Sequence, residues 1–134
     1  MRAVIVSGAR HADWSAWCVV VDDALLAASV GVPQLVVIHG AASGIDAIAN
    51  RVVDTHRGMV DLPLPGQWTT HGKAAGPMRN DAMLKMLMIF KEHGYDVQVM
   101  AFHDDLDGSK GTKDMVGRAR RAGVPVSVFT TKGT

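Results

Sequence analysis

Short apolar runs and segments of helical periodicity alternate along this 134-residue chain. Five runs rich in β-branched residues predict strands at residues 3–7, 34–39, 59–64, 96–102 and 124–129. Between them, apolar side chains recur at the 3.6-residue helical period in four segments, which begin near Trp14, Ile45, Met83 and Met115. Such alternation predicts right-handed crossovers and a five-stranded, mainly parallel sheet with helices on both faces, the doubly wound α/β class.

The predicted helix ends carry recognisable capping residues. Asp13 precedes the first helical segment and is a suitable N-cap. Three helical segments run into a glycine shortly before the next strand, at Gly31, Gly94 and Gly123. Because each glycine can adopt a left-handed conformation, we expect each to end its helix.

Composition indicates one ordinary globular domain, residues 1–130, followed by a short tail, residues 131–134. Hydrophobic residues make up 48% and charged residues 20%, with a net charge of +1, which does not favour disorder or electrostatic attachment to nucleic acid or membrane. No apolar run approaches the ~18 residues of a membrane span, and the opening resembles no signal peptide. We expect a cytoplasmic protein, with the single Cys18 as a buried thiol.

The loops that follow the predicted strands are rich in glycine and small residues. In a parallel sheet these loops share the carboxyl edge, where ligands bind. Glycine allows close backbone approach, and helix N-termini attract anions. Candidate phosphate-binding or ligand-binding residues at this edge are Gly8, Arg10, Gly40, Ser43, Gly44, Lys73, Gly76, Asn80, Gly111 and Thr112.

Other ligand classes are disfavoured by the motifs. The chain lacks both the G-x-G-x-x-G fingerprint and the G-x-x-x-x-G-K-[ST] P-loop, which argues against nicotinamide cofactors and NTP hydrolysis. His39, His71 and His103 do not have zinc-site spacing, so we expect no metal site. No cofactor is required, although Mg²⁺ accompanying a phosphate near Asp104 and Asp105 is left open.

At these loops the sequence resembles the SLOG superfamily, within it the YspA-type, cpYpsA-related branch of bacteria and phages. The superfamily also includes the LOG phosphoribohydrolases and the DprA/Smf proteins. The resemblance covers nearly the whole chain and rests on Gly8-Ala9-Arg10 with Asp13-Trp14, on 39–46 (HGAASGID), on Trp68 with 71–80 (HGKAAGPMRN) and Met83, on Ala101-Phe102, on Gly111-Thr112 with Asp114-Met115, and on 122–126 (AGVPV).

The resemblance implies a Rossmann-like fold that binds nucleotides or phosphoribosyl compounds at the carboxyl edge, often as a homodimer. LOG enzymes cleave the N-glycosidic bond of nucleoside monophosphates, and their motif arginine corresponds to Arg79. Their P-G-G-x-G-T-x-x-E loop corresponds to residues 107–115. Here Asp107-Gly108-Ser109 replaces its first residues, and Met115 stands where the family has glutamate.

That departure leaves two functions open. Glycosidic cleavage needs a carboxylate on one face of the site. A helix turns about 100° per residue, so Asp114 does not point where the missing glutamate would. Either the protein is a phosphoribohydrolase, in which Arg79 positions the phosphoribosyl group and Asp114 or Asp46 supplies the carboxylate, or it binds a nucleotide without cleaving it, as a sensor or sequestering module. We favour binding, in which Asp46 bonds ribose hydroxyls. Trp68 either stacks on a base, packs on a neighbouring subunit or packs in the core.

Two further expectations concern partners. Single-stranded DNA binding of the DprA kind is disfavoured by the near-neutral charge and by only three tryptophans and one tyrosine. The segment MLKMLMIF, residues 83–90, is apolar around most of a helix, which exceeds one core-facing stripe. We therefore expect its outer side to contribute to a homodimer.

Overall fold

The structure is a computed structural model that describes residues 1–132, apart from the side chains of residues 68 and 69. Its elements are β1 Arg2–Gly8, α1 Trp14–Ser29, β2 Leu35–His39, α2 Ile45–Asp54, β3 Met59–Pro63, α3 Trp68–His71, the 3₁₀ turn η1 Gly72–Ala74, α4 Ala75–Glu92, β4 Asp96–Phe102, α5 Gly111–Arg121 and β5 Val126–Phe129. The five strands pair in parallel in the order β3-β2-β1-β4-β5. The predicted doubly wound α/β fold is confirmed.

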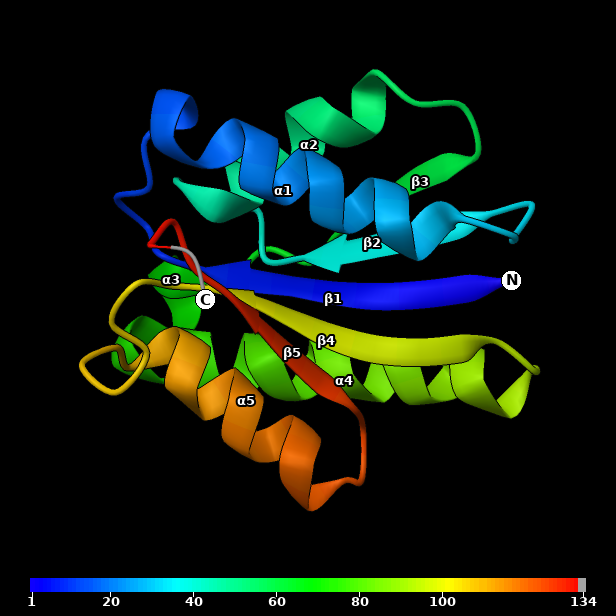
Figure 1. The fold of residues 1–134 in the computed structure, drawn as a ribbon. Helices are drawn as coiled ribbons and strands as arrows, with labels where there is room; N and C mark the ends of the chain where they lie inside the picture. The colour runs from blue at the N-terminus through cyan, green and yellow to red at the C-terminus, as the bar shows by residue number, and fades with distance from the viewer. Residues whose placement is uncertain (133–134) are drawn as a thin grey trace.

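The helices form one layer on each face of the sheet (Figure 1). The chain winds outward from β1 to β3 with α1 and α2 on one face, and then crosses to β4 and β5 with α4 and α5 on the other. Because right-handed crossovers in opposite directions place helices on opposite faces, the reversal beside β1 produces two separate apolar cores. All strands end at the same edge, where the loops 8–13, 40–44, 64–67 and 103–110 gather.

The predicted helix ends are confirmed in their geometry. Asp13 caps α1, since its carboxylate accepts the backbone N–H of Ser15 at 3.0 Å. Gly31, Gly94 and Gly123 follow α1, α4 and α5 with φ of 76°, 88° and 74°. These left-handed residues turn the chain back toward the sheet.

Some boundaries and environments differ from the sequence-based expectation. Residues 68–74, expected as loop, form α3 and η1, and α4 already begins at Ala75. Arg79 is therefore the fifth residue of its helix. Cys18 is partly exposed in the groove between α1 and α2, which corrects the expected buried thiol. In the tail, Thr131 donates its backbone N–H to Asp104 at 2.7 Å.

Most of the apolar segment of α4 faces the core. Met83 and Leu87 are buried, while Met86, Met88 and Phe90 pack partly against the same cluster. Ile89 is 49% exposed and is the large apolar side chain of this segment that faces solvent. In the part of the chain that the structure describes, no helix combines the length and apolar character needed to cross a membrane.

Two glycines determine how closely α2 approaches the end of β1. A Cβ at Gly8 would lie 2.5 Å from the Phe102 carbonyl oxygen and from Cγ1 of Ile45. A Cβ at Gly44, whose φ is 71°, would lie 2.1 Å from the Ala9 carbonyl oxygen. The Ile45 N–H donates to that same oxygen at 3.1 Å, so the start of α2 rests directly on the loop after β1.

We predict that Gly44→Ala destabilises the protein by more than Gly31→Ala. Both glycines have a positive φ, which costs roughly 1–2 kcal/mol for alanine, but a Cβ at Gly31 meets nothing within 4 Å. The excess loss at Gly44 measures the backbone clash. Urea unfolding of both variants gives the comparison, and equal losses would contradict the close approach.

Candidate functional site

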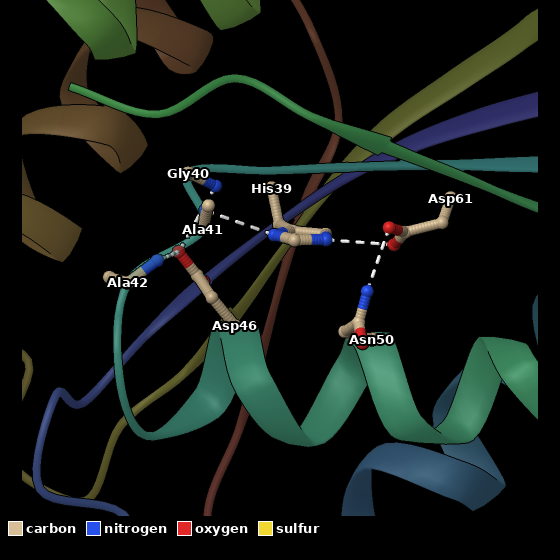
Figure 2. A network of polar contacts seen from close by, with 7 residues as sticks. All are labelled: His39, Gly40, Ala41, Ala42, Asp46, Asn50 and Asp61. Atoms are coloured by element: carbon tan, nitrogen blue, oxygen red, sulfur yellow. Dashed lines mark hydrogen bonds and ion pairs between the residues drawn. The ribbon is translucent and has the colours of Figure 1, made fainter.

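The loop after β2 wraps around the carboxylate of Asp46, in the first turn of α2 (Figure 2). Oδ2 of Asp46 accepts the backbone N–H groups of Gly40 at 3.0 Å and Ala42 at 3.2 Å. Between these two donors, Ala41 adopts a φ of 56°, which is uncommon for a residue with a Cβ. The Asp46 side chain is buried, with 6% of the residue exposed. The carboxylate thus organises a strained and closely fitted loop.

A second hydrogen-bond network fixes Ala41 from the side of the sheet (Figure 2). His39 Nδ1 accepts the Ala41 N–H at 3.0 Å, and His39 Nε2 lies 2.7 Å from Oδ1 of Asp61. Asn50 Nδ2 donates to the other Asp61 oxygen at 2.8 Å. Since Nδ1 is an acceptor here, the hydrogen of the ring is on Nε2 and the imidazole is neutral. His39 therefore acts as a structural link in this arrangement, with both ring nitrogens engaged.

Arg79 reaches the same loop from the opposite face of the sheet. A Cβ at Gly40 would lie 2.7 Å from Cδ, Nε and Cζ of Arg79, so the guanidinium lies directly against the Gly40 backbone. Arg79 Nε and Nη1 are buried, and neither has a hydrogen-bond partner among the described residues. Leaving a buried donor unsatisfied costs about 1–3 kcal/mol, and more for a charged group. An arrangement that bears this cost favours binding of an acceptor from outside the chain.

Burial perturbs both charged groups at the loop. Desolvation raises the pKa of Asp46, although the Ala42 and Gly40 N–H groups and the charge of Arg79 oppose the shift. Desolvation also lowers the pKa of Arg79, which the Asp46 carboxylate opposes and the Arg10 guanidinium reinforces. Arg10 is therefore close enough to add a second positive charge. Two cations near one buried carboxylate leave a local excess of positive charge suited to an anion.

A cavity of about 300 Å³ adjoins Arg79 on the side of α4. It lies between the segment 64–67 and the first turns of the helix, and its lining is mainly apolar. Leu64 at its base continues the edge of β3, because the Leu64 N–H donates to the His39 carbonyl oxygen at 2.7 Å. The cavity thus adjoins the loop after β2, which Asp46 and Arg79 also contact.

Several predicted ligand residues meet at this loop, though some bond to the protein itself. Gly40, Asp46, Arg79 and Arg10 lie together, as the preceding contacts show. Ser43, however, donates its hydroxyl to the Arg10 carbonyl oxygen at 2.9 Å. Gly8 and Gly44 also pack closely on neighbouring backbone atoms. The close packing of neighbouring atoms around Gly8, Gly40 and Gly44 explains why these positions are glycine.

Asn80, Asp114 and Gly111 form a separate cluster that joins α4 to α5. Asn80 Nδ2 donates to the Gly111 carbonyl oxygen at 3.1 Å and to Asp114 Oδ2 at 2.9 Å. The same Asp114 oxygen accepts Arg118 Nε at 2.8 Å. Asp114 is thereby engaged within the protein, which weakens its candidacy as the catalytic carboxylate.

The remaining candidates lie at or just before the starts of α4 and α5. Thr112 is buried at the start of α5, Gly76 lies in the first turn of α4, and Lys73 is exposed in η1. The Trp68 side chain, expected to stack on a base or to pack, lies outside the described residues.

Polar side chains of the loop 103–110 form hydrogen bonds with backbone N–H groups of the loop and of the start of α5. Asp105 accepts the Gly108 N–H at 3.2 Å, and the Ser109 hydroxyl accepts the Lys113 N–H at 3.1 Å in the first turn of α5. The Ser109 hydroxyl therefore occupies one backbone N–H donor at the start of α5. No group of three His, Cys, Asp or Glu side chains in the described chain is placed to hold a metal ion.

The His39, Asp61 and Asn50 network was not predicted from the sequence. A usable signal was the polar Asp61 within the apolar run MVDLPL, paired in register with buried Val37 of β2. His39 lies two residues beyond Val37 and therefore on the same face of the sheet.

We predict that Asp61→Ala destabilises the protein by about 1–3 kcal/mol, because His39 Nε2–H is left buried without an acceptor. Asp96→Ala is the matched control. Asp96 pairs with Arg2 at 3.1 Å, but its side chain is 72% exposed, and such pairs contribute less than about 1 kcal/mol. Urea unfolding distinguishes the two, and a loss at Asp61 no larger than at Asp96 would contradict the network's structural role.

We predict that Asp46→Asn raises stability at neutral pH. The raised pKa of Asp46 means that the folded state favours the protonated carboxyl, so this group's stabilising contribution is present below its ordinary value of 3.8 and is lost as pH rises through the folded pKa. Asparagine keeps an acceptor for Gly40 and Ala42 without the charge. The advantage over the native protein should shrink as pH falls toward 3.8, and a variant less stable at pH 7 would contradict this.

A comparison with curated proteins places the chain in a phage family. It is 33% identical over 148 aligned residues to the "Gene 61 protein" of Mycobacterium phage D29, covering 98% of this chain and 99% of that protein. No family model matches the sequence. At this identity and coverage, the chain belongs to the family of the Mycobacterium phage D29 Gene 61 protein.

Proposed function

We propose that this protein binds a nucleotide or another phosphoribosyl-containing ligand, as a sensor or sequestering module. The observation that carries the proposal is the guanidinium of Arg79, whose Nε and Nη1 are buried yet have no hydrogen-bond partner in the described chain. Arginine binds phosphate through paired, charge-assisted hydrogen bonds, so a phosphate group would satisfy these donors. Arg10 supplies a second positive charge nearby.

The other parts of the site suit the rest of such a ligand. Gly40 lets the Arg79 guanidinium lie against the backbone, which holds its planar face in one orientation. Asp46 supplies a carboxylate beside it that accepts two backbone N–H groups and is a candidate acceptor for ribose hydroxyls. The resemblance to the SLOG superfamily supports the same ligand class, since Arg79 occupies the position of the LOG motif arginine.

The second candidate is N-glycosidic cleavage by a LOG-like phosphoribohydrolase. Buried Asp46 favours it, because burial raises the pKa of this carboxyl and a protonated carboxyl can act as a general acid. Against it, Asp114 is bonded to Asn80 and Arg118, and Met115 replaces the family glutamate. We therefore place binding first and hydrolysis second.

We also propose that the protein forms a homodimer through the outer side of α4. Ile89, within the apolar segment 83–90, is 49% exposed on this helix. An interface there would cover this side chain.

We predict that Arg79→Gln weakens binding of nucleoside 5′-monophosphates by about 10–100-fold, the equivalent of one or two charge-assisted hydrogen bonds. Isothermal titration calorimetry with a panel of monophosphates measures the loss. Lys85→Ala is the control, since it also removes one positive charge from α4 but at an exposed position paired with Asp81. Equal affinities of the native and Arg79→Gln proteins would contradict the proposed phosphate site.

Chromatography of the same mixtures separates the two candidate functions. Binding without cleavage predicts that the monophosphate is recovered intact after the protein is denatured. Release of free base that stops in Asp46→Asn would establish hydrolysis instead, because asparagine cannot donate a carboxyl proton.

A further inference from the structure

The cavity beside Arg79 is lined by one face of α4 and by the chain segment that follows β3. Ala75, Met78, Arg79 and Ala82 line it from α4, at the i, i+3, i+4 and i+7 positions of one helix face. Leu64 and Pro65 line it from the segment after β3. The Leu64 N–H bonded to the His39 carbonyl oxygen ties that segment to the Asp46 loop. The cavity and the phosphate-binding candidates therefore adjoin one another at the same edge of the sheet.

The lining combines apolar surfaces with a polar margin. Leu64, Pro65 and Met78 offer apolar contacts, and a methionine sulfur favours contact with aromatic rings. Gln67 adds an amide that both donates and accepts hydrogen bonds, and His71 adds an imidazole. A volume of about 300 Å³ lies at the lower limit of small-molecule pockets. Apolar faces with polar groups at the edge match a planar heteroaromatic ring better than an acyl chain.

Met78 gives a further reason to expect a ring at this position. It lines the cavity, is 49% exposed and is next in sequence to Arg79. A ring stacked on Met78 would cover this apolar surface. At the same time it would place any phosphate attached through a sugar near the Arg79 guanidinium.

We infer that this cavity binds the base of the nucleotide, and that the segment 64–67 with Met78 sets base selectivity. This inference rests on the proposed nucleotide function and deepens it. In this arrangement the phosphate binds the Arg79 guanidinium, and the base lies in the cavity beside it. The base is recognised by Gln67 and His71 at its edge and by Pro65 and Met78 on its faces.

The test fills the cavity without touching Arg79. Ala82→Phe adds a ring at an exposed helix position that lines the cavity. Calorimetric titrations use three probes, namely ribose 5-phosphate, the four common ribonucleosides and their 5′-monophosphates. We expect the preferred monophosphate to bind the native protein about tenfold more tightly than ribose 5-phosphate, and Ala82→Phe to remove that advantage while ribose 5-phosphate binds as before.

Lys91→Phe is the matched control, because it places the same ring at an exposed position in the last turn of α4, outside the cavity lining. It should leave all affinities unchanged. The inference is overturned if the monophosphate and ribose 5-phosphate bind the native protein equally, or if Ala82→Phe weakens both equally.

Failure of the proposed function gives a different pattern. If Arg79→Gln leaves phosphate compounds unaffected or none of them binds, the phosphate site is wrong. The nucleoside titrations then test the base site by themselves. Nucleoside binding that Ala82→Phe abolishes supports a base site in the cavity, and an absence of nucleoside binding overturns it.

Discussion

The carboxylate of Asp46, enclosed by the backbone N–H groups of Gly40 and Ala42, fixes the loop on which the candidate site is built. Holding both donors on one oxygen requires Ala41 to adopt a left-handed conformation, and His39 stabilises it through Nδ1. Gly40 is thereby held where the Arg79 guanidinium lies against it. The site depends on a buried charge and a strained residue, a combination that costs stability and is typical of functional loops.

Much of the fold follows from local sequence signals. The strand at 96–102 matches its apolar run, and Asp13, Gly31, Gly94 and Gly123 mark helix ends, because these depend on near neighbours in sequence. The strand order β3-β2-β1-β4-β5 depends instead on which face each crossover packs against. The short α3 and η1 carry too few residues for a periodic pattern, so residues 68–74 were expected to be a loop.

The candidate site was predicted in part. Arg79, Asp46, Arg10 and Gly40 were selected as charged or small residues at the carboxyl edge, and the fold brings them together. Sequence alone could not distinguish a Ser43 hydroxyl that binds phosphate from one that bonds to the Arg10 carbonyl. It also could not show that Asp114 is engaged by Asn80, because that contact joins residues 34 positions apart. Such distinctions depend on tertiary distances.

The central claim is that the buried N–H groups of Arg79 are donors for an anionic ligand. The most direct measurement is the NMR resonance of Arg79 Nε–H, assigned by its absence in Arg79→Lys, during titration with ribose 5-phosphate. The account predicts a saturable downfield shift as the N–H forms a charge-assisted hydrogen bond to phosphate. An Nε–H resonance that does not move while ribose 5-phosphate binds, or an absence of binding at millimolar concentration, would contradict it.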